Sequence, residues 1–130
     1  MPRSNLFLPL VLGVFTLLSL VPLLIWDASP RLFPARAHDV LGALPLTLVA
    51  LSYLVYQAVR RVSALEFAKT VLCALAFIFW ALNQLLPEHP QATLFNDVAV
   101  AAFVVDLVLV IFGWPPPARL STPDAQGETR

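Results

Sequence analysis

Four long apolar segments constrain what this chain can fold into more than any other feature of its sequence. They cover residues 6–26, 40–59, 65–86 and 93–113, and the first of them contains no charged residue. A helix needs about 20 mostly apolar residues to cross the hydrocarbon core of a bilayer. Strands of a membrane barrel would alternate polar and apolar residues. These runs are continuously apolar, so we predict four transmembrane helices.

The connections between these segments are short. Residues 27–39 include Pro30 and Pro34, residues 60–64 form a tight turn, and the Pro87–Pro90 stretch separates the last two segments. Short connections make successive helices antiparallel neighbours. We therefore expect an all-α membrane protein with its four transmembrane helices in an up-down-up-down antiparallel bundle, formed by residues 1–113. Residues 114–130 are rich in proline and small polar residues, which predicts a disordered cytoplasmic tail.

The composition agrees with lipid as the main solvent. Charged residues make up 12% of the 130 residues, whereas a soluble domain carries about 25%. The lipid bilayer is therefore the first expected partner. The formal net charge is zero, and without a basic patch we expect no binding to nucleic acid. The single Cys73 has no internal disulfide partner, and we expect it to pack as a small apolar residue.

The distribution of Lys and Arg predicts the orientation in the membrane. Six of the eight would lie on the side of the two termini and the second loop, and only Arg31 and Arg36 on the other side. Because cytoplasmic loops carry an excess of Lys and Arg, both termini are expected in the cytoplasm. The predicted location is the cell membrane, which is the inner membrane if the source is bacterial.

Lys69 in the third predicted span and Asp106 in the fourth are charged residues that lie well inside the spans, whereas Asp97 lies nearer the start of the fourth. Charges inside a span are costly and usually face the protein interior. The two residues fall at similar depth when counted from the helix ends, so we expect an ion pair between Lys69 and Asp106. A hydrogen bond from Tyr53 or Tyr56 to Asp106 is an alternative. The functional alternative is a proton or ion relay through Asp106.

A polar cluster is expected near the opposite membrane surface, at the ends of the second, third and fourth spans. The interpretations are interhelical hydrogen bonds with solvated helix ends, or a shallow pocket for a small polar ligand or cation. Its members are His38, Asp39, Asn83, Gln84, Asn96 and Asp97.

No part of the sequence predicts a catalytic residue, a cofactor site or a metal site. The two histidines, His38 and His89, lie in separate connections, and an adjacent acidic neighbour does not point the same way along a helix. No nucleophile and base are found at one level of the bilayer. We therefore expect no enzyme activity.

The size and the four spans resemble those of small multidrug-resistance exporters, which carry an essential glutamate in their first helix. Segment 6–26 contains no acidic residue, so that family implies no site here. The sequence favours a noncatalytic accessory or structural membrane component, acting as a homo-oligomer or within a larger membrane complex. The alternative is an oligomeric small-solute or ion transporter or channel that uses the intramembrane Asp106.

Overall fold

Four long helices make up nearly all of the computed structural model, which describes residues 6–114. Each helix is long and apolar enough to cross a membrane. The predicted four-helix, all-α class is therefore confirmed, whereas the predicted tail after residue 114 lies outside the described residues. A short 3-10 turn, η2 (Pro30–Leu32), interrupts the first connection. The helices are α1 (Phe7–Ala28), α2 (Ala37–Arg60), α3 (Ala64–Leu85) and α4 (Ala92–Ile111).

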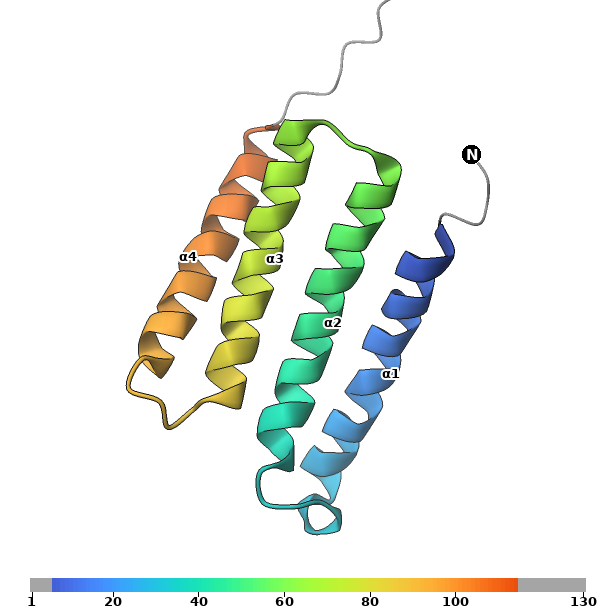
Figure 1. The fold of residues 1–130 in the computed structure, drawn as a ribbon. Helices are drawn as coiled ribbons and strands as arrows, with labels where there is room; N and C mark the ends of the chain where they lie inside the picture. Colours follow the sequence, from blue (N-terminus) through green and yellow to red (C-terminus); the bar gives the residue numbers. More distant parts are fainter. Residues whose placement is uncertain (1–5, 115–130) are drawn as a thin grey trace, which may run out of the picture.

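The helices stand side by side in one row, and neighbours run in opposite directions (Figure 1). α1 packs against α2, α2 against α3 and α3 against α4, and no other pair of these four helices is in contact. The order along the chain is the expected up-and-down order, but the row does not close around a common interior. In a bilayer, lipid tails would solvate large apolar side chains as well as protein does, so no hydrophobic force would bring α1 to α4.

Small residues form the contacts between neighbouring helices. The buried hydrophobic residues are all alanines, and small side chains let helix backbones approach closely in lipid. Large apolar side chains point away from the row instead, for example Phe7 at 69% and Leu17 at 67% exposure. The buried alanines are Ala43, Ala50, Ala74, Ala76, Ala81 and Ala99.

Hydroxyl groups inside the spans are satisfied by the backbone of their own helices. The side chains of Thr16, Thr47 and Thr70 each donate a hydrogen bond to the carbonyl oxygen four residues earlier, at 2.8–3.0 Å. Such bonds hide a polar group from hydrocarbon without a partner from another helix. One hydroxyl joins two helices, because Ser52 of α2 donates to the carbonyl oxygen of Pro9 in α1 at 3.2 Å.

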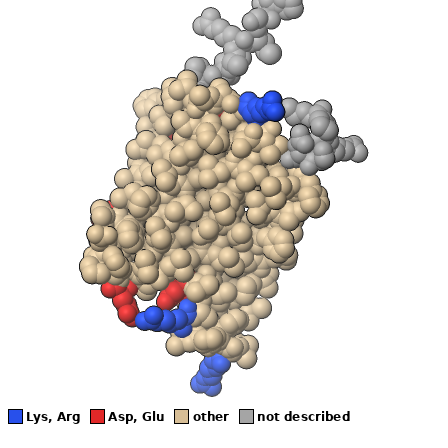
Figure 2. All heavy atoms as spheres, in the orientation of Figure 1, with Lys and Arg blue, Asp and Glu red and all other residues tan. Residues whose placement is uncertain are grey.

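The charged side chains of the visible face gather at the two ends of the row, with an uncharged belt between them (Figure 2). Arg31, Arg36 and Glu88 belong to the loops that join α1 to α2 and α3 to α4, and we call this the η2 end. The α2–α3 loop and the chain ends that lead to both termini lie at the opposite end (Figure 1), which we call the Ser63 end. There Ser63 and Glu66 form a capping box that begins α3, which satisfies free N–H groups of its first turn.

Candidate functional site

Asp106 is the one acidic side chain buried in the described part of the chain, with 8% exposure. It lies on the side of α4 that faces α3, together with the buried Ala99 and the partly buried Ala102 and Leu109. These residues are three or four positions apart in the sequence, a spacing that places them on one face of a helix. The Cys73 thiol of α3 lies beside the carboxyl group, while the Oδ1 atom of Asp106 is buried and has no hydrogen-bond partner.

Lys69 and Asp106 do not form the expected ion pair. Within residues 6–114 the only ion pair closer than 4.0 Å joins Arg36 to Glu88 at 3.5 Å, and both of its side chains are exposed. The register of α3 and α4 explains the difference. Cys73 is the α3 residue beside Asp106, and Lys69 comes four residues earlier, which is about 6 Å along the axis. The hydroxyls of Tyr53 and Tyr56 accept hydrogen bonds from Gln57 and Arg60 instead.

Lys69 lines an open hollow at the Ser63 end, where α2, α3 and α4 meet the α2–α3 loop. The hollow has a volume of about 510 Å³. Arg60 and Gln57 of α2 lie in its wall, and sequence reasoning missed both as site residues. Gln57 is a polar residue inside the predicted span 40–59, two residues before its end, and this is the signal that could have identified it. We call this hollow the Lys69 pocket; it is lined by Tyr53, Gln57, Arg60, Val62, Glu66, Lys69, Val110, Gly113 and Trp114.

The structure divides the outer polar cluster at the η2 end. His38 and Gln84 line one hollow between α1, α2 and α3, whereas Asp39 lines another with Arg36, Glu88 and His89. The His38 ring lies 4.5 Å from that of Trp26. Gln84 rests on Gly42, where an added Cβ would come within 3.3 Å of its Oε1 atom.

Three members of that cluster, one from α3 and two from α4, lie apart from the first hollow. Asn83 of α3 and Asn96 of α4 are partly buried, and Asp97 is exposed. The contact of Phe77 with Phe103, at 6.4 Å between ring centroids, sets a register that places Asn83 at the level of Asn96 and Asp97. None of these three residues lines a hollow that contains His38, Asp39 or Gln84. Neither of these two hollows therefore contains the whole cluster.

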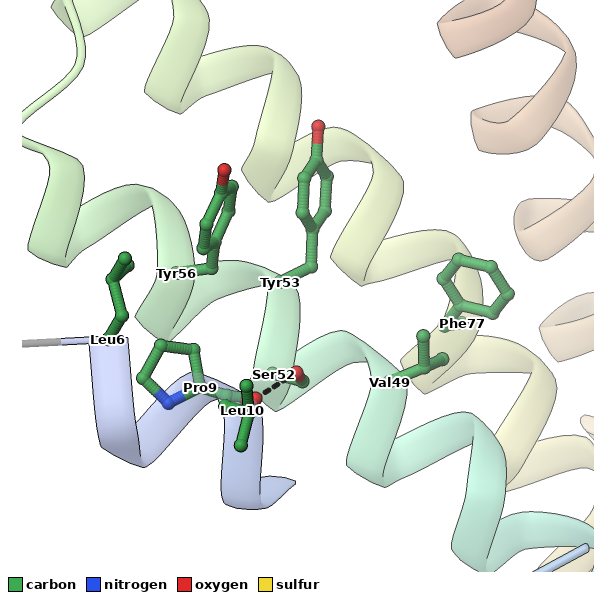
Figure 3. Close-up of a pocket in the computed structure, with 8 residues that line it drawn as sticks. All are labelled: Leu6, Pro9, Leu10, Val49, Ser52, Tyr53, Tyr56 and Phe77. Atoms are coloured by element: carbon green, nitrogen blue, oxygen red, sulfur yellow. Dashed lines mark hydrogen bonds between the residues drawn. The ribbon is translucent and has the colours of Figure 1, made fainter. Parts of the chain in front are cut away.

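One face of α2 forms the floor of a groove between α1 and α3. Two hollows of about 500 and 460 Å³ follow each other along this face and share Val49. Figure 3 shows the first of them, with the rings of Tyr53 and Tyr56 standing off α2 and Ser52 reaching the Pro9 carbonyl of α1. We call this the α2 groove; its floor is formed by His38, Gly42, Pro45, Leu46, Val49, Ser52, Tyr53 and Tyr56.

Six of the floor residues form a stripe of mostly small and polar residues on one face of α2, because they are three or four positions apart in the sequence. They are His38, Gly42, Pro45, Val49, Ser52 and Tyr56. What the sequence does not reveal is that α1 and α3 stand on both sides of it as walls, because that depends on how the helices pack. Within residues 6–114, no three His, Cys, Asp or Glu side chains lie close enough together to hold a metal ion.

No protein-family model, curated protein or solved structure matches the chain. The function must therefore be argued from the geometry.

The absence of an ion pair within 4.0 Å predicts that Lys69 and Asp106 contribute to stability largely independently. We expect Lys69→Met and Asp106→Asn to change the free energy of unfolding additively, within about 0.5 kcal/mol, since no direct contact joins the two side chains. A double-mutant cycle on unfolding in mixed detergent micelles measures this. A coupling energy above about 1 kcal/mol would show that a direct ion pair forms in the membrane.

Proposed function

We propose that this chain is a noncatalytic accessory or structural component of a membrane assembly, and that its α2 groove receives a transmembrane helix of another subunit. The observation that carries the proposal is the open row, which leaves the groove without a covering helix from the described chain.

The length of the α2 groove supports a helix as its occupant. Its floor runs from His38 to Tyr56, which corresponds to about 27 Å of helix. This is close to the thickness of the hydrocarbon core, about 30 Å. A helix that crosses the membrane would therefore contact the groove along its whole length.

The residues of the groove also favour a helix over lipid chains. Gly42 and Ser52 on the floor and Thr16 on the α1 wall are small or hydroxylated. Interfaces between membrane helices are enriched in such residues because they permit close approach. The outer sides of α1 and α4 carry large apolar residues instead, such as Leu24 at 65% and Ile111 at 80% exposure, which lipid tails solvate well.

A photoreactive benzoyl-phenylalanine in place of Tyr53 tests this proposal. Tyr53 lines the α2 groove at 36% exposure, and the neighbouring Leu51 is exposed at 44% but does not line it. After irradiation in the membranes of the source cell, we expect position 53 to form protein adducts and position 51 to form lipid adducts. An adduct of twice the chain mass identifies a second copy, and any other protein mass identifies a different subunit. Only lipid adducts at position 53 would refute the proposal.

A second candidate function is proton- or ion-coupled transport by an oligomer. It is favoured by the carboxyl group of Asp106, which is buried inside a span with one oxygen unpartnered. Ionisable groups in such positions often mark ion pathways.

Proton flux distinguishes the two candidates. For a proton-coupled carrier, we expect Asp106→Asn to abolish acidification of liposomes reported by an internal pH-sensitive dye, and Asp97→Asn, at an exposed position of the same helix, to preserve it. Flux that is absent from the unmodified chain, or unchanged in Asp106→Asn, would argue against the transporter.

We further propose that the Ser63 end and both termini face the cytoplasm, and that the chain resides in the cell membrane. The excess of Lys and Arg in the second loop and the termini supports this orientation. Reporter fusions test it: alkaline phosphatase should be active when fused after Gln91, and a fluorescent protein should fluoresce when fused after Val62. The reverse result would invert the topology.

A further inference from the structure

The Lys69 pocket carries two cationic side chains from different helices. Arg60 ends α2, and Lys69 lies in the second turn of α3 and is partly buried. Neither forms an ion pair with the residues that the structure describes. The Arg60 guanidinium is held over the Tyr56 ring, 5.4 Å from its centroid, and donates a hydrogen bond to the Tyr56 hydroxyl. The pocket therefore presents two positive charges at the edge of the spans.

Glu66, the acidic residue of the pocket wall, is already engaged elsewhere. Its Oε2 atom accepts hydrogen bonds from the backbone N–H and the hydroxyl of Ser63, at 3.1 and 3.2 Å. The capping box thus holds this carboxylate at the start of α3, so the lining has a net charge of +1. An anion is the ligand that such a lining favours.

Gln57 adds a different requirement to the same pocket. Its Oε1 atom is buried and has no hydrogen-bond partner, while its Nε2 atom donates to the Tyr53 hydroxyl at 3.4 Å. A buried acceptor without a donor costs about 1–3 kcal/mol. A ligand with a hydrogen-bond donor as well as negative charge would remove this cost once the Gln57 side chain turns toward it.

The surroundings of the pocket place it where lipid headgroups lie. Trp114 lines it, and tryptophan is enriched at the boundary between hydrocarbon and water. Val110 is also in the wall and is exposed at 51%, and Leu107 and Phe103, on the same face of α4 toward the middle of the helix, are exposed at 45% and 38%. This apolar surface continues from the pocket along α4 and suits the acyl chains of a bound lipid.

We propose that the Lys69 pocket binds the phosphodiester headgroup of an anionic, hydroxylated phospholipid. The phosphate lies between Arg60 and Lys69, the Gln57 side chain turns to bring Oε1 to a headgroup hydroxyl, and the acyl chains follow α4. Basic pockets between membrane helices are a known way of selecting anionic lipids. A phosphate dissolved in water offers the pocket the same chemistry as the phosphodiester of a lipid headgroup, so the experiments below distinguish these two sources.

Quenching of Trp114 by brominated lipids tests the proposal. The variant Trp26→Phe/Trp80→Phe retains Trp114 as its single tryptophan. It is placed in mixed bilayers in which either phosphatidylglycerol or phosphatidylcholine carries the bromine. We expect phosphatidylglycerol to quench Trp114 well beyond its share of the bilayer. Lys69→Gln and Arg60→Gln should each reduce that preference about fivefold, whereas Lys69→Arg should retain it.

Arg61→Gln is the matched control, because Arg61 directly follows Arg60 at the end of α2 but does not line the pocket. If the lipid binds in the pocket, Arg61→Gln should change the preference for phosphatidylglycerol less than twofold. If Arg61→Gln reduced the preference as much as Lys69→Gln, the lipid would be attracted by the overall positive charge of this end and not by the pocket, which would overturn the proposal. Equal quenching of Trp114 by the two brominated lipids would also overturn it.

Native mass spectrometry of the unmodified chain, released from the same bilayers, provides a second measurement that does not depend on the tryptophan variant. Retained phosphatidylglycerol adducts that Lys69→Gln removes support the proposal. Displacement of those adducts by inorganic phosphate or glycerol phosphate would overturn the lipid assignment, because the site would then take its phosphate from water.

Discussion

The length and apolar surface of the four helices, which suit a hydrocarbon core free of water, are the constraint on which this structure depends. Every backbone N–H and C=O group there must be satisfied within the protein, and long helices do so within one segment. Because lipid tails also remove the hydrophobic force between helices, contacts form only where backbones come close. The buried alanines are the residues that permit this. The result is a row in which each helix contacts only its neighbours along the chain.

The same constraint separates the polar side chains into two groups. Thr16, Thr47 and Thr70 bond to their own helices and need no partner, so they reveal little about function. Asp106 and Gln57 each retain a buried oxygen without a partner. Both lie in the half of the row that ends at Ser63. A buried polar atom without a hydrogen-bond partner lowers the stability of the fold. A ligand, an ion or a second protein that supplied the missing partner would therefore add most to stability in this half.

The open row also connects the proposed assembly role with the proposed lipid site. The α2 groove lies over α2 between α1 and α3, and the Lys69 pocket lies where α2, α3 and α4 meet. Tyr53 belongs to the walls of both. A helix in the groove and a headgroup in the pocket would thus both contact Tyr53.

The sequence alone determined the four helices, their alternating order and the stripe of small and polar residues on α2, because hydrophobic length and helical spacing are local properties. Tertiary structure decided the rest. The register of α3 and α4 places Cys73 beside Asp106 and moves Lys69 one turn away, which counting from helix ends does not resolve. Packing also sends His38 and Gln84 into a different hollow from Asp39. Which faces meet depends on close approach between particular helices, and hydrophobicity does not specify that in a solvent as apolar as the side chains themselves.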